Sequence, residues 1–212
     1  MIFYVGRLVR EKGVQIVLEA LPAILGRFPR VKFVVAGTGP HAEYLKNRTR
    51  ELGLEDKVHF SGYISDELRN ELYRAAHVAV FPSLYEPFGI VALEAMVSGT
   101  PVLVSATGGL DEIITHETDG LKAYPGDVQS LVEQICRLLE NKEWAAGLAA
   151  RAYERALNIY SWDKIALRTA DVYKEIISSA ANKRWQEGTA PKKPRKEPAG
   201  KKKEKELELS RR

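Results

Sequence analysis

The residues best suited to chemistry lie in one stretch, residues 82–99, which reads PSLYEPFGIVALEAMVSG. Its first half is typical of a loop and its second half of a helix, so the two should meet near Gly89. Because the first amides of a helix lack partners and the dipole there favours negative charge, residues 88–91 should offer N–H groups to a phosphate. Glu86 and Glu94 flank this position, and carboxylates accept hydrogen bonds from neighbouring sugar hydroxyls. The stretch therefore indicates a ligand that is part phosphate and part sugar.

Two cations, Arg7 and Lys12, lie in an earlier loop, residues 6–13, which follows a short apolar run. Lys12 is at or just before the start of a helix, where a positive charge opposes the dipole and costs about 0.3–1 kcal/mol. Taken alone, two solvated side chains would explain this pattern best. Their convergence on one loop of a net-acidic region suggests a bound polyanion instead.

The net charge of +4 combines two regions of opposite sign. Of the 32 Lys and Arg residues, 12 lie in residues 183–212, together with 5 of the 28 Asp and Glu residues. The preceding part therefore carries −3, which gives no indication of nucleic-acid binding. Residues 182–212 should form a disordered basic tail, because they bury too little apolar surface to offset the entropy of ordering. A solubilising tail is the favoured interpretation, and weak contact with an anionic membrane is the alternative.

Several classes of site are disfavoured by composition. The single cysteine, Cys136, lies in an apolar helical stretch and should be a buried structural thiol. The four histidines show no metal-ligand spacing, so no metal is expected. No signal peptide or membrane-crossing run is visible, which predicts a cytoplasmic protein that is at most peripheral to a membrane.

Two further patterns in the sequence can be interpreted in more than one way. The turn at residues 37–40 (GTGP) is not G-x-G-x-x-G and lacks the acidic residue that would hold an adenosine ribose, which disfavours a dinucleotide-dependent dehydrogenase. Its glycines fit either a close approach of the backbone to a ligand or a tight turn. Glu86 and Glu94 could be an acid/base pair for hydrolysis, but no other feature points to activation of water.

Strand-like and helix-like segments alternate along the chain. Most of the strand-like runs are apolar throughout, which is typical of a parallel sheet covered by helices on both faces. We therefore predict an α/β, Rossmann-like domain over residues 1–181, with ligands beyond the carboxyl ends of the strands. The six expected strands are residues 1–6, 31–36, 58–61, 78–81, 101–105 and 120–124, with helices at residues 14–26, 41–52, 66–76, from 90, 110–114, 128–140, 142–157 and 162–181.

Together these loops resemble the C-terminal half of a family-4, retaining glycosyltransferase with the GT-B architecture of two Rossmann-like domains. The matching motifs span most of residues 1–181 in the family's order. They are G-R-L-x3-K-G at residues 6–13, A-G-T-G-P at 36–40, H-F-S-G-Y-I at 59–64, P-S-L-Y-E-P-F-G-I-V-A-L-E-A-M at 82–96, G-T-P-V at 99–102 and G-G at 108–109.

The resemblance implies a role for each candidate residue. Arg7 and Lys12 would bind the diphosphate of a nucleotide-sugar donor and stabilise the charge that grows on the leaving nucleotide. Glu86 would hold the hydroxyls of the donor sugar, so these three are the expected catalytic residues. Glu94 would accept from the ribose. The other expected donor-binding residues are Gly6, Gly39, Ile64, Phe88, Gly89 and Ile90. The resemblance implies no cofactor and no metal.

The family enzymes have an N-terminal domain that holds the acceptor, and this chain starts at the strand that opens the second domain. We therefore expect a hexosyltransferase domain that binds its donor but transfers little by itself, with the acceptor domain supplied in cis or by a partner chain. One alternative is a non-catalytic nucleotide-sugar-binding module or subunit. Another is an epimerase or phosphorylase of the same architecture, although no motif for a pyridoxal-phosphate lysine is present. The donor base, the sugar and the acceptor are left open.

Overall fold

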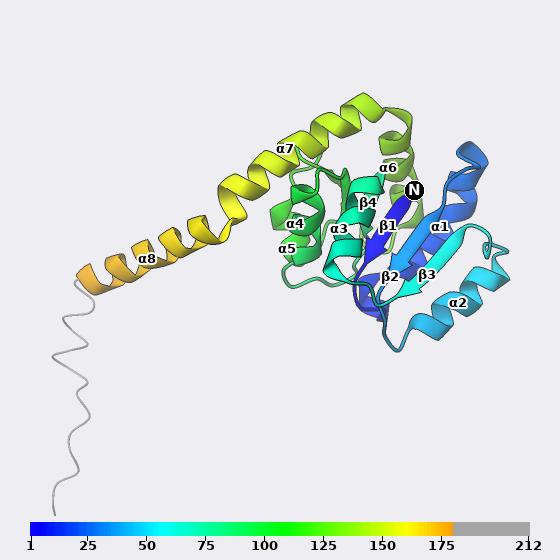
Figure 1. Ribbon diagram of the computed structural model, residues 1–212, viewed down its shortest axis with the longest axis horizontal. Coiled ribbons are helices and arrows are strands. Elements are labelled where there is room, and N and C mark those ends of the chain that lie inside the picture. The colour runs from blue at the N-terminus through cyan, green and yellow to red at the C-terminus, as the bar shows by residue number, and fades with distance from the viewer. Residues whose placement is uncertain (180–212) are drawn as a thin grey trace, which may run out of the picture. The chain divides into compact units, whose positions relative to one another are not determined.

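The computed structural model describes residues 1–179, and the chain divides into two compact units, Met1–Lys164 and Ile165–Arg212. The first unit is a six-stranded sheet with helices on both faces (Figure 1). Its strands are β1 (Ile2–Val5), β2 (Phe33–Ala36), β3 (Val58–Gly62), β4 (Val78–Phe81), β5 (Val102–Ser105) and β6 (Leu121–Ala123). Its helices are the 3-10 turn η1 (Arg10–Lys12), α1 (Val14–Arg27), α2 (Ala42–Glu51), α3 (Asp66–Ala75), α4 (Ile90–Val97), α5 (Gly108–Ile113), α6 (Val128–Glu140) and α7 (Lys142–Tyr160).

The strands follow the order β3-β2-β1-β4-β5-β6, and every neighbouring pair is parallel. β1 and β4 therefore lie side by side at the centre of the sheet. Ile2 of β1 is opposite Phe33 of β2 on one side and Val78 of β4 on the other. Every residue of β4 and β5 is buried, because helices cover both faces of these strands.

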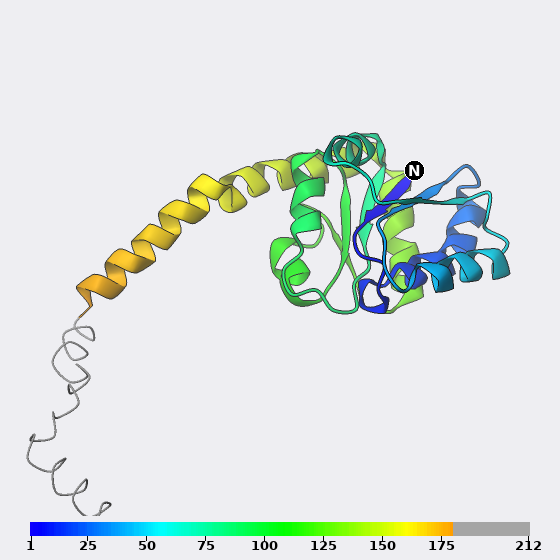
Figure 2. The same ribbon diagram turned by 60° about the horizontal axis from the view of Figure 1, so that its bottom comes forward.

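Two groups of helices sandwich this sheet (Figure 2). On one face α1 packs against α2 and α6, and on the other α4 packs against α5 and α7. Right-handed crossovers between parallel strands produce this division, because the chain passes from one half of the sheet to the other between β3 and β4. The face of α1 toward the sheet is apolar, with buried residues recurring every three or four positions: Val14, Val17, Leu18, Leu21 and Ile24.

The predicted parallel α/β sheet is confirmed, and most element boundaries agree within two residues. One difference in a boundary matters for the site. The short helix expected from residue 110 begins two residues earlier, at Gly108. Its first turn packs onto the loop that follows β4, where the backbone N–H of Gly109 donates to the carbonyl of Glu86 at 3.0 Å. A side chain at either glycine would prevent this contact.

The second unit is described as far as residue 179 and consists of most of α8 (Trp162–Ser178) and the residue that follows it. The helix predicted over residues 162–181 is therefore confirmed up to Ser178. The predicted domain boundary at residue 181 and the basic tail at residues 182–212 lie outside the described residues and stay predictions. Among residues 1–179, no helix is both long and apolar enough to cross a bilayer.

Candidate functional site

The strand order creates a crevice between two loops at the centre of the sheet. From β1 the chain proceeds outward to β2 and β3, and from β4 it proceeds in the opposite direction to β5 and β6. The loops that follow β1 and β4 therefore diverge, and such a switch point is where open α/β sheets bind ligands. The two loops that held the sequence candidates, residues 6–13 and 82–89, are these two loops.

Backbone contacts lock the two loops together. The amides of Leu84 and Tyr85 donate to the carbonyl of Glu11 at 2.7 and 3.3 Å. Gly13 has φ +72°, and a Cβ atom there would lie 1.9 Å from the carbonyl oxygen of Pro82. Only glycine permits both this dihedral angle and this approach. The loop conformation therefore fixes where Lys12 points.

Lys12 points at the second loop, where it forms an ion pair with Glu86. Its Nζ lies 2.5 Å from Oε2 of Glu86, and the two side chains are only 20% and 9% exposed. Ser83 Oγ donates to the same oxygen at 3.4 Å. Desolvating two charges is costly, so a pair this buried at the mouth of a crevice favours a ligand that interacts with both.

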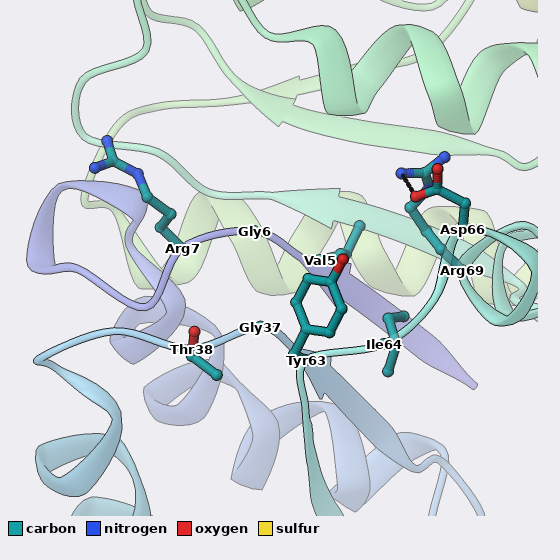
Figure 3. A pocket seen from close by; sticks show the side chains of 9 residues that line it. All are labelled: Val5, Gly6, Arg7, Gly37, Thr38, Tyr63, Ile64, Asp66 and Arg69. Carbon is teal, nitrogen blue, oxygen red and sulfur yellow. Dashed lines mark hydrogen bonds and ion pairs between the residues drawn. The ribbon is translucent and has the colours of Figure 1, made fainter.

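Two adjoining clefts open at this edge of the sheet. The first, here the Lys12 cleft, has a volume of about 270 Å³ and is lined by Tyr4, Val5, Gly6, Arg7, Lys12, Phe81, Ser83, Glu86 and Val91. The second, the Ile64 cleft, has a volume of about 330 Å³ and is lined by Val5, Gly6, Arg7, Gly37, Thr38, Tyr63, Ile64, Asp66 and Arg69 (Figure 3). Residues 5–7 line both clefts, so one ligand can extend from the first into the second.

Arg7 and Gly6 lie where the two clefts meet. The Arg7 side chain is exposed, and its backbone carbonyl accepts a hydrogen bond from the Tyr4 hydroxyl at 3.0 Å. Burial, and then the charge of Glu86, raise the pKa of that hydroxyl, so Tyr4 stays neutral as a donor. The structure thus brings both cations of the first loop to one crevice.

The helix start predicted near Gly89 is at Ile90, and Gly89 caps it with φ +101°. Within the described part of the chain, the amides of residues 88–91 donate to no acceptor. Val91 lines the Lys12 cleft, whereas the side chains of Phe88 and Ile90 are half-exposed and line neither cleft. A ligand would contact the backbone of these two residues, as predicted. At φ +101° any side chain would be strained, and a Cβ atom at Gly89 would also meet a methyl group of Leu110 at 2.6 Å, so this turn favours glycine.

Glu94 lies one turn further along α4 and belongs to a network that the sequence did not reveal. Its Oε2 accepts from the hydroxyl of the buried Tyr73 at 3.4 Å, and its Oε1 lies 3.5 Å from Nη1 of Arg69. Arg69 also pairs with Asp66 at 2.9 Å and lines the Ile64 cleft. Burial raises the pKa of the Glu94 carboxyl, and the charge of Arg69 partly opposes that increase. The only available signal was the i, i+3 spacing of Asp66 and Arg69 after the loop at Ile64.

Gly39 packs against the backbone of the first loop and lines neither cleft. A Cβ atom on it would lie 2.3 Å from the carbonyl oxygen of Leu8. The backbone of Leu8 also donates to Thr38 and accepts from His41, each at 2.9 Å. Of the two interpretations of this turn, close backbone packing is the one that the geometry favours at Gly39. Thr38 and Gly37, which line the Ile64 cleft, are the residues of the turn nearest to a ligand.

The arrangement is suited to an anion with a polyhydroxyl group attached. Cations and open amides surround the Lys12 cleft, and carboxylates lie beside both clefts. In residues 1–179, no group of three or more His, Cys, Asp or Glu side chains is placed to hold a metal. Cys136 is buried, as predicted, and burial raises the pKa of its thiol, so it is a poor nucleophile.

Comparisons with known proteins show the family and the fold of this chain. The family model for glycosyl transferases group 1 matches residues 1–155. A glycosyltransferase of Methanocaldococcus jannaschii described as uncharacterized is 44% identical over 174 residues, covering 82% of this chain but only 44% of that relative. The crystal structure of Anabaena HepE in complex with UDP-glucose is 28% identical with a TM-score of 0.76, over 82% of this chain and 48% of that one.

A third comparison matches a separately crystallised domain. The C-terminal domain of a group 1 glycosyl transferase from Francisella tularensis is 27% identical with a TM-score of 0.69, over 76% of this chain and 86% of that one. The chain thus spans less than half of its full-length relatives and most of a C-terminal domain. The fold, the matched residues and the motifs agree: this chain belongs to the glycosyl transferases group 1 family, and its fold is that of the C-terminal half of a GT-B protein.

Proposed function

We propose that this chain is the donor-binding half of a retaining hexosyltransferase. It binds a nucleotide-diphosphate sugar across the two clefts, and a further domain, in cis or on another chain, supplies the acceptor. The observation that carries the proposal is the buried Lys12–Glu86 pair beside the open amides of α4. A diphosphate satisfies Lys12, Arg7 and the amides, while a sugar hydroxyl satisfies Glu86.

In this proposal the nucleoside end of the donor occupies the Ile64 cleft. Ile64 and Val5 give that cleft an apolar wall for a base. Glu94 is not one of its lining residues but pairs with Arg69, which is, and in this proposal it receives the ribose hydroxyls. The diphosphate lies at the junction near Gly6 and Arg7, and the sugar points past Glu86. The solved complexes of Anabaena HepE with UDP and UDP-glucose support a ligand of this class.

The charge distribution also suggests how the chain would assist the reaction. When the bond between sugar and diphosphate breaks, negative charge increases on the leaving oxygen. Lys12 is held beside that position by its ion pair with Glu86, and Arg7 lines the same cleft, so both cations are placed to stabilise the charge. These cations would supply the neutralisation that a divalent metal supplies elsewhere, so we expect donor binding to be unaffected by EDTA.

Calorimetric titration tests the proposal directly. The purified 212-residue chain would be titrated with UDP-, ADP- and GDP-glucose, with and without EDTA. We expect one of them to bind, and Glu94→Ala to weaken both that donor and its nucleoside diphosphate by at least tenfold, because each contains the ribose. Glu112→Ala, which removes an exposed carboxylate on α5, is the matched control. If none of the three donors binds, the proposal is wrong.

A second assay separates the alternatives. The donor that binds would be incubated with the chain alone and its products followed by NMR. We expect the donor to remain intact, because the acceptor domain is missing from the reaction. Conversion of the sugar to an epimer would indicate an epimerase, and rapid transfer or hydrolysis would contradict the dependence on a second domain.

A further inference from the structure

Arg69 occupies the end of the Ile64 cleft opposite Arg7 (Figure 3). Its side chain is three-quarters buried, with 24% of it exposed. Its Nη1 contacts two carboxylates, Asp66 of its own helix at 2.9 Å and Glu94 of α4 at 3.5 Å. Its Nε is buried and has no hydrogen-bond partner within the described part of the chain. An arginine held this way is a built element of the cleft and not a solvated surface side chain.

The other side chain that contacts Glu94, Tyr73, is fixed in the core. Tyr73 is fully buried, and its ring packs edge-on against Phe3 with centroids 5.2 Å apart. Its hydroxyl lies within hydrogen-bond distance of the carbonyl of Val91, at 3.1 Å, and of Oε2 of Glu94, at 3.4 Å. The single Tyr73 proton is shared between these two acceptors, so one carboxylate oxygen of Glu94 has a shared donor in the core, and the other pairs with Arg69 at the cleft. Of these two partners of Glu94, Arg69 lines the Ile64 cleft and Tyr73 does not.

We propose that Arg69 is a positioning residue for donor binding, which holds Glu94 as an oriented, ionised acceptor for the ribose hydroxyls. The inference rests on the proposed function, because it assigns Arg69 a part in the same site. Asp66 completes the arrangement by fixing the guanidinium on α3. The three residues form a chain from the helix that follows the Ile64 loop to the helix that begins at Gly89.

The electrostatics give the proposal a measurable consequence. Burial raises the pKa of Glu94; the Arg69 charge and the Tyr73 hydroxyl lower it, and the Asp66 charge raises it. Among residues 1–179, these three groups, all on α3, are the charged or titratable groups found to act on Glu94, and the rest of α4 is apolar. An ionised carboxylate accepts from both ribose hydroxyls, and protonation removes part of that capacity. Donor affinity should therefore fall as the pH drops through the pKa of Glu94.

The test follows donor affinity against pH in the full 212-residue chain. The probe is whichever of UDP-, ADP- or GDP-glucose binds most tightly, because a diphosphate diester lacks the phosphate ionisation near pH 6 that would obscure the result. Arg69→Gln should weaken binding about fivefold at pH 7 and move the acidic decline to higher pH. Arg69→Lys keeps the charge and should retain most of the wild-type pH profile. Arg74→Gln, which removes an exposed cation of the same helix, should change affinity less than twofold.

A double-mutant cycle distinguishes positioning from a separate contact. Glu94→Gln should abolish the acidic decline, and adding Arg69→Gln to it should cost no further affinity, because Arg69 would have nothing left to orient. Thermal unfolding of each variant checks that it is folded. If Arg69→Gln weakens binding equally at every pH, or adds its full effect to Glu94→Gln, the inference is overturned while the proposed function stands. If the wild-type chain binds none of the three donors, both are overturned.

Discussion

Two ion pairs in this molecule are nearly alike in chemistry and differ in what surrounds them. Arg48 of α2 forms a two-point contact with Glu19 of α1, at 2.6 and 2.9 Å, and about a third of each side chain is exposed. Lys12 and Glu86 join two loops at the sheet edge and are far more buried. The first pair lies in the helical layer and stabilises a packing contact. The second lies in a crevice, where burial gains little stability and where we propose that the charges contact the donor.

Substitutions in the two pairs should therefore have different effects. Removing a structural ion pair should lower the free energy of unfolding and leave donor affinity unchanged. Removing an ion pair that belongs to the binding site should lower donor affinity even when a second substitution restores the stability. The close approach of the two site loops should matter for both stability and donor binding, because it brings Lys12 to Glu86.

The largest effect is expected from breaking that approach with Gly13→Ala. The new Cβ atom would meet the carbonyl of Pro82 at 1.9 Å in a residue with φ +72°. We expect the free energy of unfolding to fall by about 3 kcal/mol, measured by urea denaturation, and donor binding to be lost. Gly26→Ala is the control, because nothing lies within 4 Å of its added methyl group, and it should be neutral or slightly stabilising. Equal stability of the two variants would contradict the role of Gly13.

The next effect concerns the site pair itself. Lys12→Met leaves Glu86 buried without its partner, so the free energy of unfolding should fall by about 2 kcal/mol and donor affinity by at least tenfold. Adding Glu86→Gln should restore the stability but not the affinity, measured by thermal unfolding and calorimetry. Recovery of donor binding in the double variant would mean that the pair is structural.

A smaller effect is expected in the helical layer. Glu19→Gln removes the contact with Arg48 and should lower the melting temperature by about 2 °C at pH 7 without changing donor affinity. The hydrogen bond from Arg48 lowers the pKa of Glu19 from its usual 4.5, so the stabilisation is present above that value and lost as the pH falls through the lower folded pKa. The melting temperatures of the two proteins should therefore converge in acid. A loss of donor binding in Glu19→Gln would contradict a purely structural role for the Arg48–Glu19 pair.

The smallest effect has the opposite sign. Burial raises the pKa of Glu94, so its charge costs stability above the folded pKa and costs none below the unfolded value. Glu94→Gln should therefore raise the melting temperature by about 1 °C at pH 7, with the gain disappearing near pH 4. Calorimetric scans at the two pH values measure it. A lower melting temperature at pH 7 would show that Arg69 and Tyr73 outweigh burial.

Much of the site could be predicted because its parts lie within two short stretches. A loop that enters a helix after Gly89 and a carboxylate at Glu86 are local features of the chain. Arg69 and Tyr73 could not be predicted, because nothing in their own helix indicates that Glu94 lies opposite them. Gly39 shows the same limit: its spacing fits a ligand contact and a packing contact equally, and only the position of Leu8 distinguishes the two.

Local patterns of residues were enough to predict which segments are strands, which loops hold the cations and carboxylates, and the family to which those loops belong. Hydrophobic period, turn residues and motif order carry this information within short segments of the chain. That β1 and β4 are neighbours, and that Lys12 therefore meets Glu86 across 74 positions of chain, became visible in the folded protein. A parallel strand can pair with any other apolar strand of similar length, so packing of the whole sheet selects the strand order, and that order places the charges.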